Sequence, residues 1–246
     1  PDMQQWEYRA KKWDAVTTPV TIALVGKYTG LGDSYLSVTK ALLHSSIACD
    51  RKLDLLWVEA SDLEEETKSE DMSKYEAAWE SVKKAQGILV PGGFGGRGTE
   101  GKMIAAKYAR ENKVPYLGIC LGMQCMVIEY ARNVLGLSDA HSTEMEPETK
   151  NPAVIFMPEG SKTHMGGTMR LGSRRTIFQT QECISSRLYG KVPHVDERHR
   201  HRYEVNPDMV PQLDAAGCKF VGKDDTQTRM EICEVDGHPF MVGCQY

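Results

Sequence analysis

The sequence predicts an α/β fold with a central, mostly parallel sheet flanked by helices, and extra antiparallel strands in its C-terminal half. Short apolar runs of strand length alternate with longer helical patterns over residues 20–135, and this alternation is typical of parallel sheets with helical connections. After about Asn151 the rhythm changes to shorter, strand-rich runs. A chain of 246 residues, 41% of them hydrophobic, is long enough to bury one sizeable core, so we expect one main domain over residues 19–246.

The predicted elements follow one another in a regular order. In the first half, strands and helices alternate over residues 21–25, 33–48, 53–58, 72–85, 88–90, 99–111, 116–119 and 121–135. In the second half, strand-like runs cover residues 153–157, 175–179, 200–205, 219–221, 230–234 and 240–245. The acidic stretch 61–74 has no apolar surroundings in the sequence, which favours a solvated loop or helix surface. Residues 1–18 contain a short amphipathic segment, Trp6 to Trp13, which we expect to be a linker helix from an absent domain.

Composition and charge exclude several classes of function. The formal net charge of −4 gives no basic footprint for nucleic acid, and no run of about eighteen apolar residues marks a membrane span. The seven cysteines are an odd number without CxxC spacing, in a chain that shows no signal peptide, which is typical of reduced thiols in the cytoplasm. The chain opens on Pro1 and stops on Tyr246 directly after a strand-like run, so we expect a fragment of a longer protein.

A cysteine boxed by glycines is the strongest functional signal. Gly118, Cys120 and Gly122 lie between the apolar run that ends at Ile119 and a helical stretch that begins at Leu121. This is the cysteine form of the nucleophile elbow, a sharp strand-to-helix turn in which only glycines fit around a strained nucleophile. The helix N-terminus offers partial positive charge that favours a thiolate, which predicts a reactive Cys120 exposed at the C-terminal edge of the sheet. A tight turn with an inert thiol is the structural alternative.

A glycine-rich loop, residues 91–98, follows the strand predicted over 88–90. It contains the spacing G-x-G-x-x-G, but a dinucleotide site would need an acidic residue about twenty positions further on, where Gly118 and Cys120 stand. A phosphate-binding P-loop is excluded because Gly-Lys-Ser/Thr is missing. Bare glycine backbone can instead turn an N–H toward a developing oxyanion, which predicts Gly93 and Leu121 as the two donors beside Cys120. A loop that only makes a turn is the alternative.

Longer motifs extend this pattern along the chain. They are Pro91-Gly92-Gly93-Phe94-Gly95, Gly118-Ile119-Cys120-Leu121-Gly122-Met123-Gln124, Asn133-Val134-Leu135-Gly136, Ser142-Thr143-Glu144, Gly166-Gly167-Thr168-Met169-Arg170-Leu171-Gly172 and Glu197-Arg198-His199-Arg200-His201-Arg202-Tyr203-Glu204-Val205-Asn206. Together they resemble the glutaminase domain of the CTP synthase family. The resemblance covers residues 20–246 and implies a flavodoxin-like glutamine amidotransferase domain.

The resemblance implies roles for particular residues. Cys120 attacks the side-chain amide of glutamine to form a γ-glutamyl thioester, and the backbone N–H groups of Gly93 and Leu121 form the oxyanion hole. The residues implied to bind glutamine are Gly93, Phe94, Leu121, Gly122, Met123, Gln124, Glu144 and Arg202. A guanidinium at Arg202 suits the substrate carboxylate.

For some of these residues the sequence offers a simpler explanation than the role that the resemblance implies. Without it, Glu144 is better explained as a helix cap, Gln124 as an ordinary exposed helix residue and Met123 as core packing. Arg170, within the run from Gly166 to Gly172, is implied to belong to a lid that the family links to activation by GTP. An ordinary hairpin loop is the alternative for that run.

The same resemblance implies a two-part reaction. Glutamine is the substrate of this domain, which needs no cofactor of its own. Ammonia then passes to an amidoligase domain, absent here, that converts UTP to CTP with ATP and Mg²⁺, and GTP is the activator. We expect the whole enzyme to be a cytoplasmic homo-oligomer without a nucleic-acid or membrane partner.

The run from Arg198 to Arg202 alternates arginine and histidine. As a strand it places Arg198, Arg200 and Arg202 on one face and His199 and His201 on the other, and three arginines on one face call for anionic partners. A zinc site on the two histidines would need further ligands. The spacing suggests none, so we expect no metal.

The thioester mechanism also needs a histidine that accepts the thiol proton and an acid that orients it. In the family these lie in a His-Pro-Glu motif after a strand of the Gly-x-Gln-Tyr type, and we expect this chain, which stops at Gly243-Cys244-Gln245-Tyr246, to be cut just before it. His238 begins the last predicted strand, so we expect it at the far end of the sheet in a structural role. Two alternatives are a catalytically incomplete glutamine-binding or regulatory module, and another triad amidotransferase.

Overall fold

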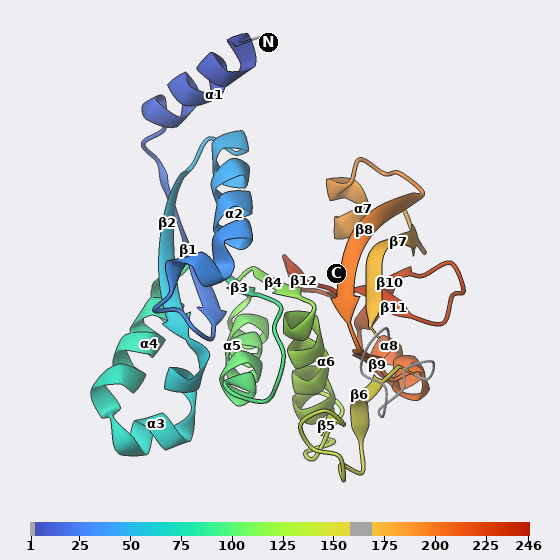
Figure 1. Cartoon of the computed structure of the whole chain (residues 1–246). Helices are drawn as coiled ribbons and strands as arrows, with labels where there is room; N and C mark the ends of the chain where they lie inside the picture. Colours follow the sequence, from blue (N-terminus) through green and yellow to red (C-terminus); the bar gives the residue numbers. More distant parts are fainter. Residues whose placement is uncertain (1–2, 158–168) are drawn as a thin grey trace.

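The computed structural model describes residues 3–157 and 169–246. Within these residues, a nine-stranded sheet runs in the order β2-β1-β3-β4-β12-β11-β10-β7-β8, and a three-stranded sheet in the order β5-β6-β9 (Figure 1). The strands of the large sheet are β1 (Pro19–Gly26), β2 (Lys52–Glu59), β3 (Gly87–Val90), β4 (Tyr116–Ile119), β7 (Arg170–Phe178), β8 (His194–His201), β10 (Cys218–Lys223), β11 (Met230–Val235) and β12 (Met241–Cys244). Those of the small sheet are β5 (His141–Ser142), β6 (Pro152–Phe156) and β9 (Tyr203–Val205).

The helices connect the strands in the order predicted for the first half of the chain. They are α1 (Gln4–Ala15), α2 (Leu36–Ala48), α3 (Glu65–Glu70), α4 (Met72–Lys84), α5 (Thr99–Asn112), α6 (Leu121–Asn133), α7 (Ile184–Leu188) and α8 (Val210–Ala215), with single 3₁₀ turns at Gly32–Tyr35, Ala60–Leu63 and Pro207–Met209. The helix predicted over 33–48 is therefore a 3₁₀ turn followed by α2.

The parallel half of the sheet confirms the predicted fold class. Strand β1 pairs in parallel with β2 and β3, β3 with β4, and β4 with β12. Counted along this half, the order is the 2-1-3-4-5 of flavodoxin-like folds. The remaining pairs, from β12 through β11, β10 and β7 to β8, are antiparallel, so the extra antiparallel strands lie in the C-terminal half as predicted.

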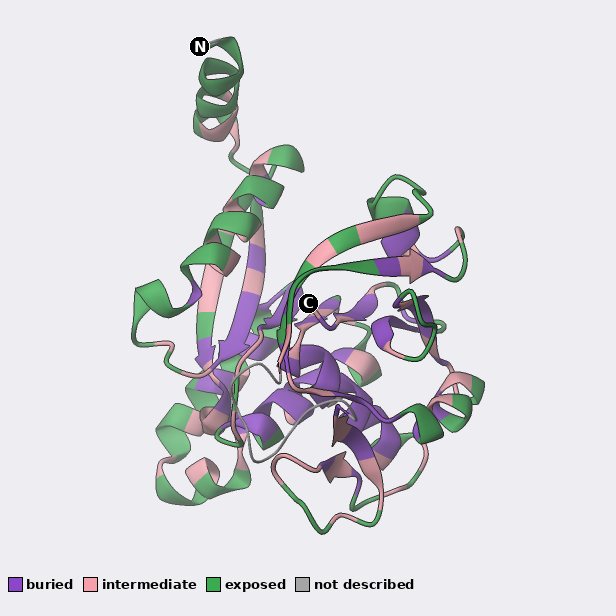
Figure 2. Cartoon of the chain, turned by 45° about the vertical axis from the view of Figure 1, so that its right-hand side comes forward, coloured by how far each residue is buried: buried purple, intermediate pink, exposed green. Residues whose placement is uncertain are grey.

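Alternate residues of the central strands pack on opposite faces of the sheet. Ala23 and Val25 of β1 belong to the main core, which α4, α5 and α6 complete, whereas Leu24 between them packs with residues of α2 on the other face. This is the period of two that a strand imposes. In Figure 2 the buried residues accordingly run through the central strands and α6, while α1 is exposed along most of its length.

The acidic stretch over 61–74 differs from the prediction. Leu63 is 1% exposed and belongs to the main core, and the Glu64 carboxylate accepts a hydrogen bond from the Gly101 amide at 2.9 Å. Burial raises the pKa of Glu64, although this hydrogen bond opposes the shift. The cause is a contact remote in sequence: α5 lies so close that a Cβ at Gly101 would come 1.7 Å from the carbonyl oxygen of Ala60.

A second difference lies in the run predicted as one strand over 200–205. Strand β8 ends at His201 in the large sheet, and β9 begins at Tyr203 in the small sheet, so the chain changes sheets at Arg202. The short helices α7 and α8 and the short strand β5 were not predicted. All seven cysteines are free thiols. No helix in residues 3–157 or 169–246 has both the length and the apolar character to span a bilayer.

Candidate functional site

The strand-to-helix turn at Cys120 has the strained geometry that the glycine spacing predicts. Cys120 has φ 51° and ψ −105° between β4 and α6, a conformation that residues with a side chain rarely adopt. A Cβ at Gly118 would lie 2.6 Å from the carbonyl of Gly122, and a Cβ at Gly122 would lie 2.1 Å from the carbonyl oxygen of Val90. Only glycines allow this close approach, so the elbow is confirmed as a structure.

The neighbouring strand β12 brings its end to the elbow. The Cys120 amide donates to the carbonyl of Cys244 at 2.6 Å, and the side-chain amide of Gln245 lies 3.6 Å from the Cys120 sulfur. Burial raises the pKa of the Cys120 thiol to about 11, the Leu121 amide opposes this, and the carboxylate of Glu144 adds to it. The helix N-terminus therefore favours the thiolate as predicted, but burial has the larger effect. The prediction that Cys120 is exposed is wrong, because the residue is half-buried.

The glycine-rich loop meets Cys120 at the same edge of the sheet. A Cβ at Gly92 would lie 3.3 Å from the Cβ of Cys120, and one at Gly93 would lie 3.6 Å from Cδ2 of Leu121. The ammonium of Lys27, directly after β1, donates a hydrogen bond to the carbonyl of Phe94 and so holds the glycine-rich loop in position. The structure thus brings together the two groups predicted to form the oxyanion hole, Gly93 and Leu121.

The first turn of α6 is buried, which changes the explanation of Gln124. It is 3% exposed, and its Nε2 donates to the carbonyl of Tyr203 at 2.9 Å and to Oε1 of Gln245 at 3.3 Å. The alternative of an ordinary exposed helix residue is wrong. Met123 is fully buried, and a Cβ at Gly243 would lie 2.8 Å from its Cγ and 2.9 Å from the sulfur of Cys233, so the side chain of Met123 packs in the core.

Glu144 lies near the elbow, and neither Glu144 nor Arg202 is in a helix. The Glu144 amide donates to the hydroxyl of Ser142 at 3.2 Å in a turn after β5, so Glu144 caps no helix. The negative charge of its carboxylate raises the pKa of the Cys120 thiol. It also raises the pKa of the Tyr203 hydroxyl, on which burial has the larger effect. Arg202 is half-buried at the point where the chain passes from one sheet to the other. Its positive charge opposes the rise in the pKa of Tyr203.

The histidines and two of the three arginines occupy opposite faces of β8, as predicted, but Arg202 lies after the end of this strand. Arg198 and Arg200 are exposed, whereas His199 and His201 are 1% and 2% exposed. The Arg200 guanidinium lies 5.7 Å from the centre of the Phe94 ring, so the exposed face of β8 reaches the glycine-rich loop.

The buried histidines meet an acid that spacing did not reveal. Oxygen and nitrogen atoms of His199, His201 and Glu231 lie within 4.8 Å of one another, a set that could hold a cation. The His199 ring is hydrogen-bonded to Glu231 at 2.8 Å, and Arg170 donates to the other oxygen of Glu231, also at 2.8 Å. Each carboxylate oxygen therefore has a donor, and the adjacent guanidinium disfavours a cation.

Arg170, predicted for a lid, is engaged in this buried cluster through Glu231. The preceding part of that run, Gly166 to Thr168, lies outside the described residues. His238 is in the structural role predicted for it: it lies just before β12, at the end of the strand away from Cys120, and its ring bonds to the carbonyl of Ala109 at 3.0 Å.

The structure adds two residues that sequence reasoning missed. Gln245 reaches Cys120 because β12 is parallel to β4, a pairing that the order of strands could have suggested. Lys102, in the first turn of α5, is 0% exposed, and its Nζ lies 3.8 Å from the position of a Cβ at Gly93. The sequence does contain a signal for the burial of Lys102, because this lysine falls on the apolar face of the predicted helix.

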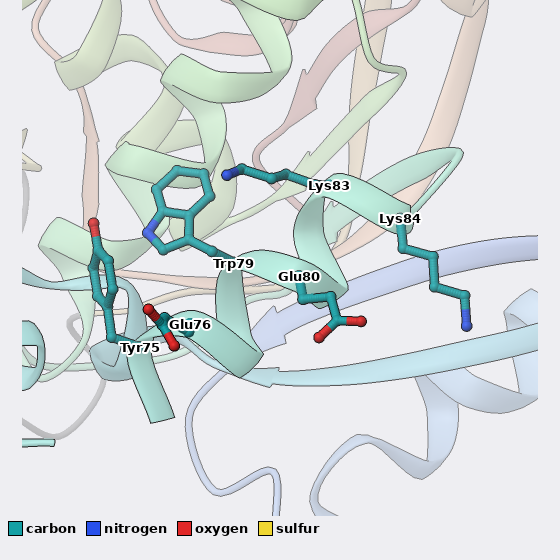
Figure 3. Close-up of a pocket in the computed structure, with 6 residues that line it drawn as sticks. All are labelled: Tyr75, Glu76, Trp79, Glu80, Lys83 and Lys84. Carbon is teal, nitrogen blue, oxygen red and sulfur yellow. The ribbon is translucent and has the colours of Figure 1, made fainter. Parts of the chain in front are cut away.

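A groove elsewhere on the molecule has no connection with these groups. It is lined by residues of α4, among them Tyr75, Trp79 and Lys83 (Figure 3). The rings of Tyr75 and Trp79 are 6.3 Å apart, and Lys83 lies 5.7 Å from the Trp79 ring. None of the predicted site residues lines it.

Comparison with known proteins gives consistent matches. Residues 31–246 match the family "Glutamine amidotransferase class-I". CTP synthase 2 of Xenopus laevis is 55% identical over 242 residues, which is 98% of this chain and 42% of that protein. CTP synthase of Eremothecium gossypii is 56% identical over 248 residues, 99% of this chain and 43% of that protein. The chain thus spans less than half the length of these curated relatives.

A solved structure matches the fold. It is the glutaminase domain of Trypanosoma brucei CTPS with bound acivicin, with a TM-score of 0.83 and 39% sequence identity, over 92% of this chain and 85% of that one.

Proposed function

We propose that this chain, which belongs to the class-I glutamine amidotransferases and among them to the CTP synthase glutaminase domains, hydrolyses glutamine through a thioester on Cys120. The observation that carries the proposal is the strained Cys120 at the elbow, with the glycine-rich loop so close that a Cβ at Gly92 would lie 3.3 Å from the Cβ of Cys120. This arrangement supplies a nucleophile and two backbone donors at one edge of the sheet.

In the proposed reaction the Cys120 thiolate attacks the γ-carbonyl carbon of glutamine. The carbonyl oxygen becomes an oxyanion, which the amides of Gly93 and Leu121 stabilise. The C–N bond then breaks, the leaving nitrogen takes up a proton equivalent to the one that the thiol lost and departs as ammonia, and a thioester remains on Cys120. Water attacks the thioester, the C–S bond breaks, a proton of that water returns to the sulfur, and glutamate is released.

The substrate's backbone end is proposed to lie between Glu144 and Arg202. Their opposite charges suit an α-ammonium and an α-carboxylate, and the charge of Glu144 acts on the Cys120 thiol. Gln124 contributes less directly, because its Nε2 is held by Tyr203 and Gln245. Phe94, 40% exposed on the loop, covers the pocket, and the backbone of Gly122 and Met123 forms its floor.

The wider role follows from the relatives. We propose that the ammonia serves an amidoligase domain that converts UTP to CTP with ATP and Mg²⁺, that GTP regulates the transfer, with Arg170 at the effector lid, and that the whole enzyme is a cytoplasmic homo-oligomer. The glutaminase step itself is proposed to need no cofactor. The seven free thiols support a reducing compartment.

Labelling with a diazo-ketone glutamine analogue tests the nucleophile. Mass spectrometry should find one label on Cys120, excess glutamine should protect it, and Cys120→Ala should abolish it. Cys49→Ala is the matched control, because Cys49 is exposed and remote from the elbow, and this variant should label like the parent. A label on another cysteine would refute the assignment.

A second candidate, a glutamine-binding module without hydrolysis, is favoured by one observation. Within the described residues, the Cys120 sulfur is hydrogen-bonded by the backbone amide of Leu121 and the side-chain amide of Gln245, neither of which accepts a proton. Calorimetric binding of glutamine without release of ammonia would favour this candidate. Turnover to glutamate would exclude it.

A further inference from the structure

Lys102 is a buried cation in an unusual place. Its side chain is 0% exposed, and its Nζ has no hydrogen-bond partner among the residues that the structure describes. An ammonium has three protons to donate, and burying one without acceptors is strongly unfavourable. Its position in the first turn of α5 is also unfavourable, since the helix N-terminus already carries partial positive charge. Packing of an aliphatic stem does not explain Lys102, because such lysines keep the amine in water.

The surroundings of the Lys102 amine point to the elbow. Its Nζ lies 3.8 Å from the position of a Cβ at Gly93, and Leu121 lies on the same side of that glycine. The other titratable groups that face it are Lys27, Glu59, Cys125 and Cys120. Glu59 is engaged elsewhere, because it accepts from the amide and hydroxyl of Thr29 and from Arg97. An anion at the elbow is therefore the partner that Lys102 lacks.

We infer that Lys102 is a positioning residue whose buried charge, set against Gly93, stabilises the thiolate form of Cys120. The inference rests on the proposed role of Cys120 as nucleophile. It supplies a reason for the unpaired amine: the compensating negative charge is present only when the thiol ionises. Burial lowers the pKa of Lys102, and the nearby thiols oppose that shift, which is the behaviour expected of groups that stabilise each other's charged forms.

Besides burial, four groups influence the ionisation of the Cys120 thiol. The backbone amide of Leu121, the side-chain amide of Gln245 and the charge of Lys102 favour the thiolate, whereas Glu144 opposes it. Cys125 also lies near Lys102, but it is 1% exposed and burial raises its pKa to about 12. A reagent from solution therefore reports on Cys120 and not on Cys125.

The test is the pH dependence of Cys120 alkylation by iodoacetamide, read by mass spectrometry on the whole chain. Lys102→Met removes the charge and keeps an unbranched side chain that is one atom shorter. We expect it to raise the apparent pKa of Cys120 by about one unit and to slow alkylation at neutral pH about tenfold. Lys107→Met, a partly exposed lysine on the same helix, is the matched control and should change neither. Identical profiles for Lys102→Met and the parent protein would overturn the inference.

A second measurement avoids any change at Lys102, in case its replacement prevents folding. Coupling between two titrating groups is reciprocal, so Cys120→Ser should lower the pKa of the Lys102 amine, measured by NMR of ¹³C-labelled lysine. An unchanged amine pKa would also overturn the inference. Labelling by the diazo-ketone analogue separates the two proposals. If Cys120 is labelled but its thiol pKa is unchanged in Lys102→Met, only the role of Lys102 is refuted. If Cys120 is not labelled but its thiol pKa shifts in Lys102→Met, only the glutaminase function is refuted.

Discussion

Cys120 carries a backbone conformation that its surroundings must enforce. A residue with a side chain at φ 51° and ψ −105° costs on the order of 1–3 kcal/mol. The hydrogen bond from its amide to Cys244 and the close contacts of Gly118 and Gly122 hold it in place. The backbone strain is thus located at the first turn of α6, at the residue whose thiol must project from the edge of the sheet.

Replacing Gly122 with alanine should disrupt the packing that keeps Cys120 in this conformation. The added Cβ would lie 2.1 Å from the carbonyl oxygen of Val90, so strand β3 or helix α6 must shift, and we expect a loss of about 3 kcal/mol in the free energy of unfolding. Urea titration measures it. Gly32→Ala is the control, since a Cβ there meets nothing within 4 Å and stability should change by less than about 0.5 kcal/mol. Equal stabilities would show that the elbow is not closely packed.

Individual residues of the site could be predicted to different extents. Cys120, Gly93 and Leu121 could be predicted from short local motifs, because the spacing of glycines around each turn restricts the backbone conformation there. Glu144 and Arg202 could be predicted only by resemblance, since their approach to the elbow depends on the small sheet. The burial of Lys102 and Gln124 depends on how α5 and α6 pack, which no local pattern contains.

At the scale of elements, strands β8 and β11 share a buried polar cluster. His201 is 2% exposed, its Nδ1 bonds to the carbonyl of Tyr203 at 3.1 Å, and its Nε2 has no partner among the described residues. Burial lowers the pKa of His201 to about 4. Burial alone would raise the pKa of Glu231, but the hydrogen bond from His199 and the charge of Arg170 hold it below its ordinary value.

Stability should therefore depend on pH through His201. Unfolding returns its pKa to about 6.5, so the unfolded chain binds the proton more readily and stability falls as pH drops from about 6.5 toward 4. The loss reaches up to about 3 kcal/mol. Urea unfolding across this range should show a shallower dependence for His201→Asn, which can still donate to Tyr203. His44→Gln, at an exposed position, should keep the parent slope; a parent slope in His201→Asn would contradict the assignment.

Elements differ in how well the sequence predicts them. The parallel strands and their helices were predicted closely because each is a regular apolar pattern bounded by polar turns. The bend at Arg202, which divides one predicted strand between two sheets, is set by pairing of β9 with β6 far earlier in the chain. The acidic stretch was misjudged because the apolar surroundings of Leu63 come from α4 and α5, not from its own neighbours.

At the scale of the whole molecule, helix α1 stands apart. None of its residues is buried, and it extends away from the sheet (Figure 1). Its contacts include the ion pair of Lys12 with Asp50 at 3.1 Å, and such exposed pairs contribute little. Trp6 is 67% exposed and Tyr8 64%, which fits the prediction of a linker segment.

Removing residues 1–16 should leave the remaining fold intact. Because no core contact is lost, we expect the melting temperature to change by less than about 2 °C, measured by circular dichroism. Leu24→Ala, in a fully buried position of β1, serves as the control that must lower it. A fall of more than about 5 °C on truncation would show that α1 belongs to the domain.

The pairing of β12 beside β4 also determines when the site can exist. Cys120 and Gln245 are 125 positions apart in the chain, yet they meet at one sulfur atom. At about 5–20 residues per second, a ribosome needs roughly 6–25 s to pass from one to the other. During that interval the elbow has been made but has no β12 beside it, so the turn that holds Cys120 is synthesised seconds before the strand that completes its surroundings.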